Sequence, residues 1–68
     1  MRYLKKLGEE IKNIRGKKHL TQEKLAEYAE MNPTHLGHIE QGIREPRIKT
    51  LIKIADALGV RVKDLIPF

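Results

Sequence analysis

Few side chains in this sequence could do covalent chemistry. The chain has no cysteine and no serine, which excludes thiol and serine nucleophiles and zinc–thiolate sites. Of the three histidines, His35 and His38 are three residues apart and could share a helix face, whereas His19 falls in a predicted loop. No glycine-rich phosphate loop and no nucleophile–base pair accompanies them. We therefore expect no enzyme activity, no metal site and no cofactor.

Positive charge is the more informative feature. The chain carries 14 Lys and Arg residues against 9 Asp and Glu, a formal net charge of +5. Residues 1–18 hold seven basic against two acidic residues, residues 19–42 one against four, and residues 43–68 six against three. A basic balance favours a nucleic-acid partner, although solvated basic faces are also common. If the central segment contacts a nucleic acid, basic segments on both sides of it supply the positive charge, because the segment itself is acidic.

The length of 68 residues allows one small domain, residues 1–68. No apolar run approaches the roughly 18 residues that a membrane span needs. The basic residues of the first six positions precede no apolar stretch, so they do not form a secretory signal. We expect a cytoplasmic, nucleoid-associated protein with no membrane partner and no small-molecule ligand.

Apolar residues at spacings of three and four predict an all-α domain of five short helices. Leu4, Leu7, Ile11 and Ile14 would line the first helix, which should end within residues 16–19. The others are expected at about 22–29, 33–41, 48–58 and 62–66. Their inward residues would be Leu25, Ala26, Ala29, Leu36, Ile39, Leu51, Ile54, Ala55, Leu58, Val62, Leu65 and Ile66.

Local signals mark the helix ends. Thr21 and Asn32 are expected N-caps, because their side-chain oxygens can accept from free amides of the following first turn. Pro33 suits the first helical position, and Gly42 and Gly59 suit left-handed ends. Only about three residues, 30–32, separate the second and third helices, which is the spacing of a helix-turn-helix.

Three segments together resemble the phage repressor and Cro family of helix-turn-helix DNA-binding domains. They are Leu20-Thr21-Gln22-Glu23-Lys24-Leu25-Ala26, Leu36-Gly37-His38-Ile39-Glu40-Gln41-Gly42, and Leu51-Ile52-Lys53-Ile54-Ala55-Asp56-Ala57-Leu58-Gly59-Val60, with Pro46 between the last two. The resemblance covers about residues 7–66. It implies a transcriptional regulator, expected to be a repressor, that binds double-stranded DNA by placing the third helix in the major groove.

The resemblance also assigns roles at the DNA. Base-reading positions would be Pro33, Thr34, Gly37 and His38, none of which offers the bidentate hydrogen bonding of Arg, Asn or Gln. We therefore expect DNA shape to contribute to specificity. Alternatively, Gly37 only relieves crowding and His38 is only solvated. Phosphate contacts are expected from Gln22, Asn32, Gln41, Arg44 and Arg47, with helix capping the preferred role of Asn32. Lys17, Lys18 and Lys49 are further candidates, or they form only a solvated basic face.

The family pattern further pairs Arg15 with Glu40 in a partly buried ion pair that ties the first helix to the third. Three positions depart from the pattern. Glu30 stands where the turn often has glycine, so a left-handed conformation there would cost roughly 1 kcal/mol. Arg47 and Arg61 stand before the fourth and fifth helices, where the family usually has a serine, so we expect weaker capping at both helix starts.

A small helix-turn-helix domain generally pairs to gain affinity, so we expect a homodimer on an inverted-repeat operator. Leu65, Ile66 and Phe68 would form its interface, or would simply cover the core. The competing function is a protein-interaction module of the same fold, an antitoxin or bridging factor with weak or partner-dependent DNA binding. The acidic central segment favours that alternative slightly.

Overall fold

A computed structural model describes residues 2–66 and 68, and five α-helices account for most of them. They are α1 (Arg2–Lys17), α2 (Gln22–Tyr28), α3 (Pro33–Glu40), α4 (Ile48–Leu58) and α5 (Val62–Leu65). No strand occurs in this part of the chain. The predicted all-α class and helix order are thereby confirmed, and the predicted helix boundaries agree with the structure to within one residue. No helix in the described residues is both long and apolar enough to cross a membrane.

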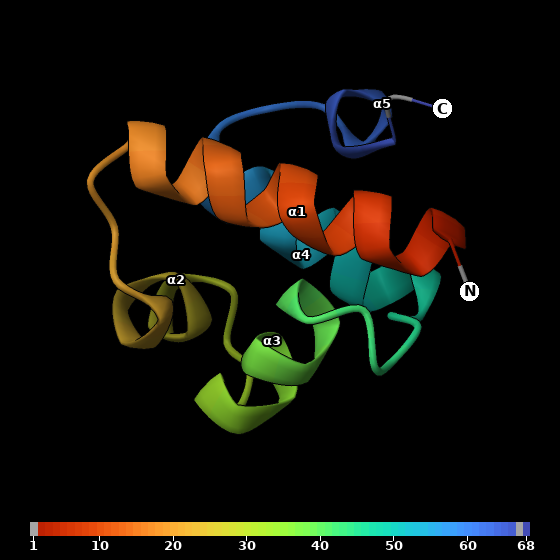
Figure 1. Cartoon of the computed structure of the whole chain (residues 1–68). Helices are drawn as coiled ribbons and strands as arrows, with labels where there is room; N and C mark the ends of the chain where they lie inside the picture. Colours follow the sequence, from red (N-terminus) through yellow and green to blue (C-terminus); the bar gives the residue numbers. More distant parts are fainter. Residues whose placement is uncertain (1, 67) are drawn as a thin grey trace.

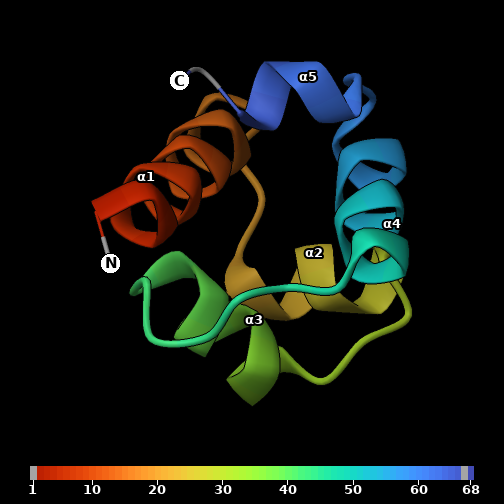
Figure 2. The ribbon, with the colours of Figure 1, turned by 90° about the vertical axis from the view of Figure 1, so that its right-hand side faces the viewer.

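The helices surround one apolar core. Helix α1 packs against α3 and α5, α2 packs against α3 and α4, and α4 packs against α5 (Figures 1 and 2). Every helix contributes at least one fully buried aliphatic side chain: Ile11, Leu25, Leu36, Ile39, Ile54, Leu58 and Leu65. Burial of these side chains is the main stabilisation of helices that are too short to persist alone.

The predicted caps are present. Thr21 Oγ1 accepts from Lys24 N at 3.0 Å, and Asn32 Oδ1 accepts from Thr34 N at 2.7 Å and His35 N at 3.3 Å. Gly59, with φ of 71°, ends α4 in the left-handed conformation. Gly42 follows α3 with φ of 77°. These groups satisfy backbone donors and acceptors that a helix end leaves unpaired.

Two further residues adopt left-handed backbone angles without being glycine. Glu30, with φ of 55°, makes the turn between α2 and α3, as its place in the family pattern indicated. His19, with φ of 58°, ends α1, so Gly16 lies inside the helix. There Leu20 N donates to Arg15 O at 3.1 Å and His19 N to Gly16 O at 3.0 Å, which caps α1 in place of a glycine.

Gly8 explains how closely α1 and α3 approach each other. A Cβ placed on Gly8 would collide with the carbonyl oxygens of Ile39 and Glu40 and would lie 2.7 Å from the carbonyl carbon of Glu40. Helix α1 therefore crosses the end of α3 at a distance that only glycine permits. The sequence gives no local sign of this role of Gly8, because its contact is with residues more than thirty positions away.

Candidate nucleic-acid interface

The start of α3 presents exposed side chains from a fixed backbone. Pro33 occupies the first helical position, where its missing N–H and preset φ cost nothing. The Asn32 carboxamide oxygen accepts hydrogen bonds from the backbone amides of Thr34 and His35. Pro33 and Thr34 are exposed, and His38, one turn further on, is half-buried. Side chains at this end can therefore meet a partner without a prior rearrangement of the helix.

Gly37 does not fit the role expected for it. It is buried, and the amide of Gln22 covers the side on which a Cβ would project, with Oε1 at 3.7 Å and Nε2 at 3.8 Å from that position. A close approach of the Gly37 backbone to a base is therefore wrong for this structure. Relief of crowding is not required either, since a methyl group would make ordinary van der Waals contacts there.

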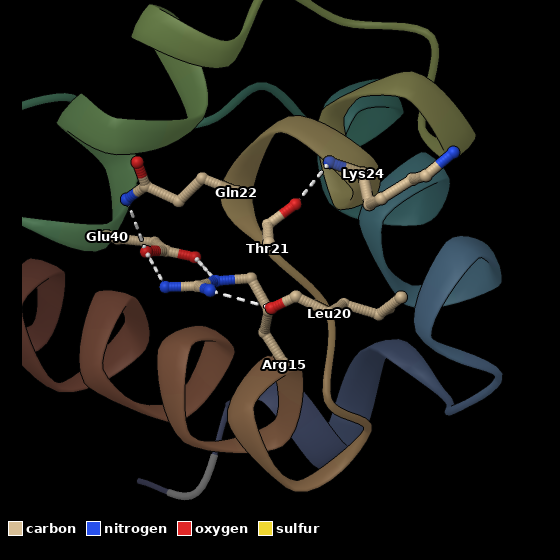
Figure 3. A network of polar contacts seen from close by, with 6 residues as sticks. All are labelled: Arg15, Leu20, Thr21, Gln22, Lys24 and Glu40. Carbon is tan, nitrogen blue, oxygen red and sulfur yellow. Dashed lines mark hydrogen bonds and ion pairs between the residues drawn. The ribbon is translucent and has the colours of Figure 1, made fainter.

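Arg15, Glu40 and Gln22 form a polar network between α1, α2 and α3 (Figure 3). Arg15 Nε donates to Glu40 Oε2 at 2.7 Å, and Arg15 Nη2 donates to Glu40 Oε1 at 3.1 Å. The third guanidinium nitrogen, Nη1, donates to Leu20 O at 2.8 Å. The ion pair expected from the resemblance is thus present, with Glu40 side-chain exposure of 2%. Such a fork-to-fork pair satisfies the charge that burial would otherwise penalise.

Gln22 is attached to this network rather than projecting freely. Its Nε2 donates to Glu40 Oε1 at 2.8 Å, so one N–H of the amide is committed inside the protein. The family resemblance predicts that Gln22 faces a phosphate, and nothing in the sequence indicates this hydrogen bond to Glu40. The second N–H and the carbonyl oxygen of the amide make no hydrogen bond within the described residues.

Exposed cations lie in the loop that follows α3, at the end of α1 and at the start of α4. Within residues 2–66 and 68, ion pairs form at Arg15–Glu40 and Lys24–Glu27. The expected phosphate-binding cations are therefore unpaired, and all are exposed: Arg44, Arg47, Lys17 and Lys49. Gln41 is also exposed at the end of α3. Asn32 uses its side-chain carbonyl oxygen as a helix cap, as its place before Pro33 predicted.

The loop after α3 is held by α1 through a contact that sequence reasoning missed. The Tyr3 hydroxyl donates to Glu45 Oε2 at 3.0 Å, and the Tyr3 ring lies 6.2 Å from that of Phe68. The hydrogen bond to the Glu45 carboxylate, with smaller effects of burial and of the charge itself, raises the pKa of Tyr3 above its ordinary value of 10.0. Tyr3 therefore links α1, this loop and residue 68.

The expected dimer interface is only partly available. Leu65 is fully buried between the helices, so its assignment to an interface is wrong, and the alternative of covering the core holds for it. Ile66 and Phe68 remain 39% and 53% exposed. Exposed apolar side chains also occur on α4, at Ile48 and Ile52, one turn apart. Neither the periodicity nor the resemblance had pointed to these two residues.

Helices α4 and α5 begin without side-chain caps from the preceding arginines, as expected from Arg47 and Arg61. In α5 the compensation comes from within the helix, because Asp64 Oδ2 accepts from Arg61 N at 3.0 Å. No such bond replaces the cap at Arg47, whose guanidinium stays exposed.

Comparisons with known proteins agree with this geometry. A helix-turn-helix family model matches residues 11–65. Control protein C.BamHI of Bacillus amyloliquefaciens is 39% identical over 62 residues, covering 90% of this chain and 76% of that protein. The immunity repressor protein of Bacillus phage phi105 is 38% identical over 60 residues, which cover 88% of this chain but only 42% of the repressor.

Solved structures are similar over nearly the whole length. The restriction-modification controller protein C.AhdI from Aeromonas hydrophila superposes with a TM-score of 0.94 at 29% identity, covering 96% of this chain and 98% of that one. The controller protein C.Esp1396I superposes with a TM-score of 0.87 at 34% identity, covering 98% and 91%. The chain therefore belongs to the helix-turn-helix family of the phage repressor and Cro type, a family of DNA-binding transcription regulators.

Proposed function

We propose that this domain binds duplex DNA in a sequence-specific manner, by inserting α3 into the major groove, and represses transcription by occupying its operator. The observation that carries the proposal is the exposed start of α3, which Asn32 caps, together with the exposed and unpaired Arg44 and Arg47 in the loop that follows α3. Such an element can meet base edges while the cations bind the phosphates on either side. A protein acting in this way would reside on the nucleoid.

The base contacts would be made by three residues. Pro33 offers apolar contact to a thymine methyl group, Thr34 can hydrogen-bond to several bases, and His38 can donate to a guanine acceptor or to a phosphate. Gly37 is not included among the proposed base contacts, because the Gln22 amide covers it. With no bidentate side chain at these positions, sequence-dependent DNA shape carries part of the specificity.

The phosphate contacts would fix the register and supply most of the affinity. They would come from the exposed cations and from polar groups near both ends of α3: Gln22, Asn32, Gln41, Arg44, Arg47, Lys17 and Lys49. Because each neutralised phosphate releases counterions, binding should weaken steeply as salt rises. A role as a protein-interaction module would not produce this dependence.

The size of the domain supports a homodimer on an inverted repeat. The longest dimension of the Cα trace is 26 Å, whereas successive major grooves on one face of DNA are about 34 Å apart. One copy therefore reaches one half-site, and two copies are needed to read an inverted repeat. The apolar residues Ile66 and Phe68 are the proposed interface. Phe68→Asp should shift the protein toward monomer in analytical ultracentrifugation, and a parent that is already monomeric at high concentration would contradict the dimer.

The test of the DNA function is selection of bound sequences from a random duplex pool at physiological salt. Enrichment of an inverted repeat with half-sites about 10 base pairs apart would support the proposal. Weak retention of DNA without enrichment of any sequence would contradict it and favour the protein-interaction module. The exposed carboxylates of Glu23 and Glu27 on α2 are the observation that favours a protein-interaction module as the second candidate function. Affinity capture with the folded domain would then be the way to find its partner.

A further inference from the structure

Residues of α3 fix a side chain that belongs to α2. Gln22 Nε2 donates to Glu40 Oε1 at 2.8 Å, and the Gln22 amide lies against the open side of Gly37. A carboxylate accepts hydrogen bonds and cannot donate them. The amide therefore cannot turn round without placing its carbonyl oxygen against an anion. Figure 3 shows the amide nitrogen directed at Glu40 and the amide oxygen directed away from it.

The Glu40 carboxylate is itself held in place. Arg15 binds both of its oxygens, at 2.7 and 3.1 Å, and the same guanidinium binds the carbonyl of Leu20 at 2.8 Å. Leu20 precedes Gln22 by two residues, so Arg15 anchors both the group that orients Gln22 and the backbone from which Gln22 projects. In the described residues, no buried side-chain nitrogen or oxygen of this region lacks a partner.

One edge of the Gln22 amide remains available. A primary amide has two N–H donors, and Glu40 takes one of them. The side chain is only half-buried, and it lies beside Gly37, one turn along α3 from the exposed residues Pro33 and Thr34. If α3 enters a groove, the phosphates that border the groove pass next to this amide, and a neutral N–H is a suitable donor to them.

We propose that Glu40 is a positioning residue for DNA binding, which turns the Gln22 amide so that its remaining N–H donates to a DNA phosphate beside α3. This inference rests on the proposed function. It gives the Arg15–Glu40 ion pair a role in binding as well as in stability. It also predicts an effect opposite to simple electrostatics, since removal of a negative charge near DNA would by itself strengthen binding.

The test compares two substitutions that remove the same charge. Glu40→Gln should weaken binding to the selected operator by about five- to tenfold, the value of one hydrogen bond to a phosphate. Glu23→Gln, at the exposed position next to Gln22, should bind as tightly as the parent or more tightly. In a Gln22→Ala background, Glu40→Gln should produce no further weakening. Circular dichroism at the binding temperature establishes that each variant is folded.

Three results would overturn the inference. They are tighter or unchanged binding by Glu40→Gln, equal weakening by Glu40→Gln with and without Gln22, and unchanged binding by Gln22→Ala. If Glu40→Gln does not fold, the side-chain amide protons of Gln22 in the parent provide the test by NMR. On saturation with operator, one proton should stay hydrogen-bonded to Glu40 and the other should shift. Loss of the first bond, or no shift of the second proton, would refute the role of Glu40.

These outcomes differ from failure of the proposed function. If the parent enriches no sequence from the random pool, DNA recognition itself is wrong. If the parent binds an operator and Gln22→Ala binds equally well, DNA recognition stands and only the positioning of Gln22 is wrong. A methylphosphonate scan of the operator adds a direct readout. Neutralising the phosphate that Gln22 contacts should weaken DNA binding by the parent more than it weakens DNA binding by the Gln22→Ala variant.

Discussion

Gly8→Ala should destabilise the domain more than any other replacement of a helical glycine by alanine. The new methyl group would be placed 2.7 Å from the carbonyl carbon of Glu40 and would collide with the backbone oxygens of Ile39 and Glu40. Backbone atoms cannot rotate aside as a flexible side chain can. Helices α1 and α3 would therefore have to move apart, which opens packing around Ile11 and strains the Arg15–Glu40 pair.

The magnitude follows from two opposing effects. Overpacking of this kind costs about 3 kcal/mol, and the better helix propensity of alanine returns roughly 1 kcal/mol, so the net loss is about 2 kcal/mol. In a domain of this length each kcal/mol shifts the melting temperature by about 4–8 °C. We expect Gly8→Ala to melt about 8–16 °C below the parent. That loss is a large part of the free energy of unfolding of a small domain.

Two other glycines provide matched controls for thermal unfolding followed by circular dichroism. A Cβ on Gly16, also in α1, would meet no atom within 4 Å, and a Cβ on Gly37 would make ordinary contacts with Gln22. Alanine at either position should therefore leave the melting temperature unchanged or raise it by a few degrees. If Gly8→Ala melted with or above Gly16→Ala, the close crossing of α1 and α3 would be wrong.

Three further predictions concern polar groups. Glu40→Ala should lower the free energy of unfolding in urea by about 3 kcal/mol, because it leaves the Arg15 guanidinium poorly solvated. Glu27→Ala breaks an exposed ion pair and should lower it by less than about 0.5 kcal/mol. Equal urea midpoints for the two variants would contradict this prediction. Tyr3 should ionise above pH 10.0 in tyrosinate absorbance, and Glu45→Gln should lower its pKa. Because the folded-state pKa of Tyr3 is raised, its contribution to stability is present below pH 10.0 and is lost as the pH rises through that folded-state pKa. If Glu45→Gln left the pKa of Tyr3 unchanged, the contact between the two residues would be refuted. Arg47→Ser should add an N-cap to α4 and about 1 kcal/mol of stability. It should also reduce by about one the slope of the logarithm of the DNA-binding constant against the logarithm of salt concentration. An unchanged slope would show that Arg47 does not contact a phosphate.

Local chemistry made the helix ends predictable from the sequence. Thr21 and Asn32 cap amides only two or three residues away, so the residues that decide those ends lie within one turn. The same holds for Gly59, whose left-handed angle ends α4. Apolar spacing likewise identified the buried faces, because a helix that packs on a core shows its period in the sequence.

Contacts between distant residues were harder to foresee. Gly8 has a role only because α1 crosses α3 there, and Tyr3 reaches Glu45 across 42 positions. Leu65 was assigned to the dimer interface, with the core as the alternative, because apolar character alone does not distinguish the two. The packing of α5 places Leu65 in the core. His19 shows a further difficulty: a non-glycine residue ends α1 in a left-handed conformation, although Gly16 stood nearby.

Glu40 shows why the candidate site could be predicted only in part. The resemblance supplied its ion pair with Arg15, and separately supplied Gln22 as a phosphate contact. Only the geometry joins the two, since Glu40 Oε1 accepts from both Arg15 Nη2 and Gln22 Nε2. A buried ion pair is often no better for stability than well-packed apolar residues. An apolar pair at these positions could hold α1 against α3, but it would leave the Gln22 amide free to rotate beside the surface where α3 is proposed to meet DNA.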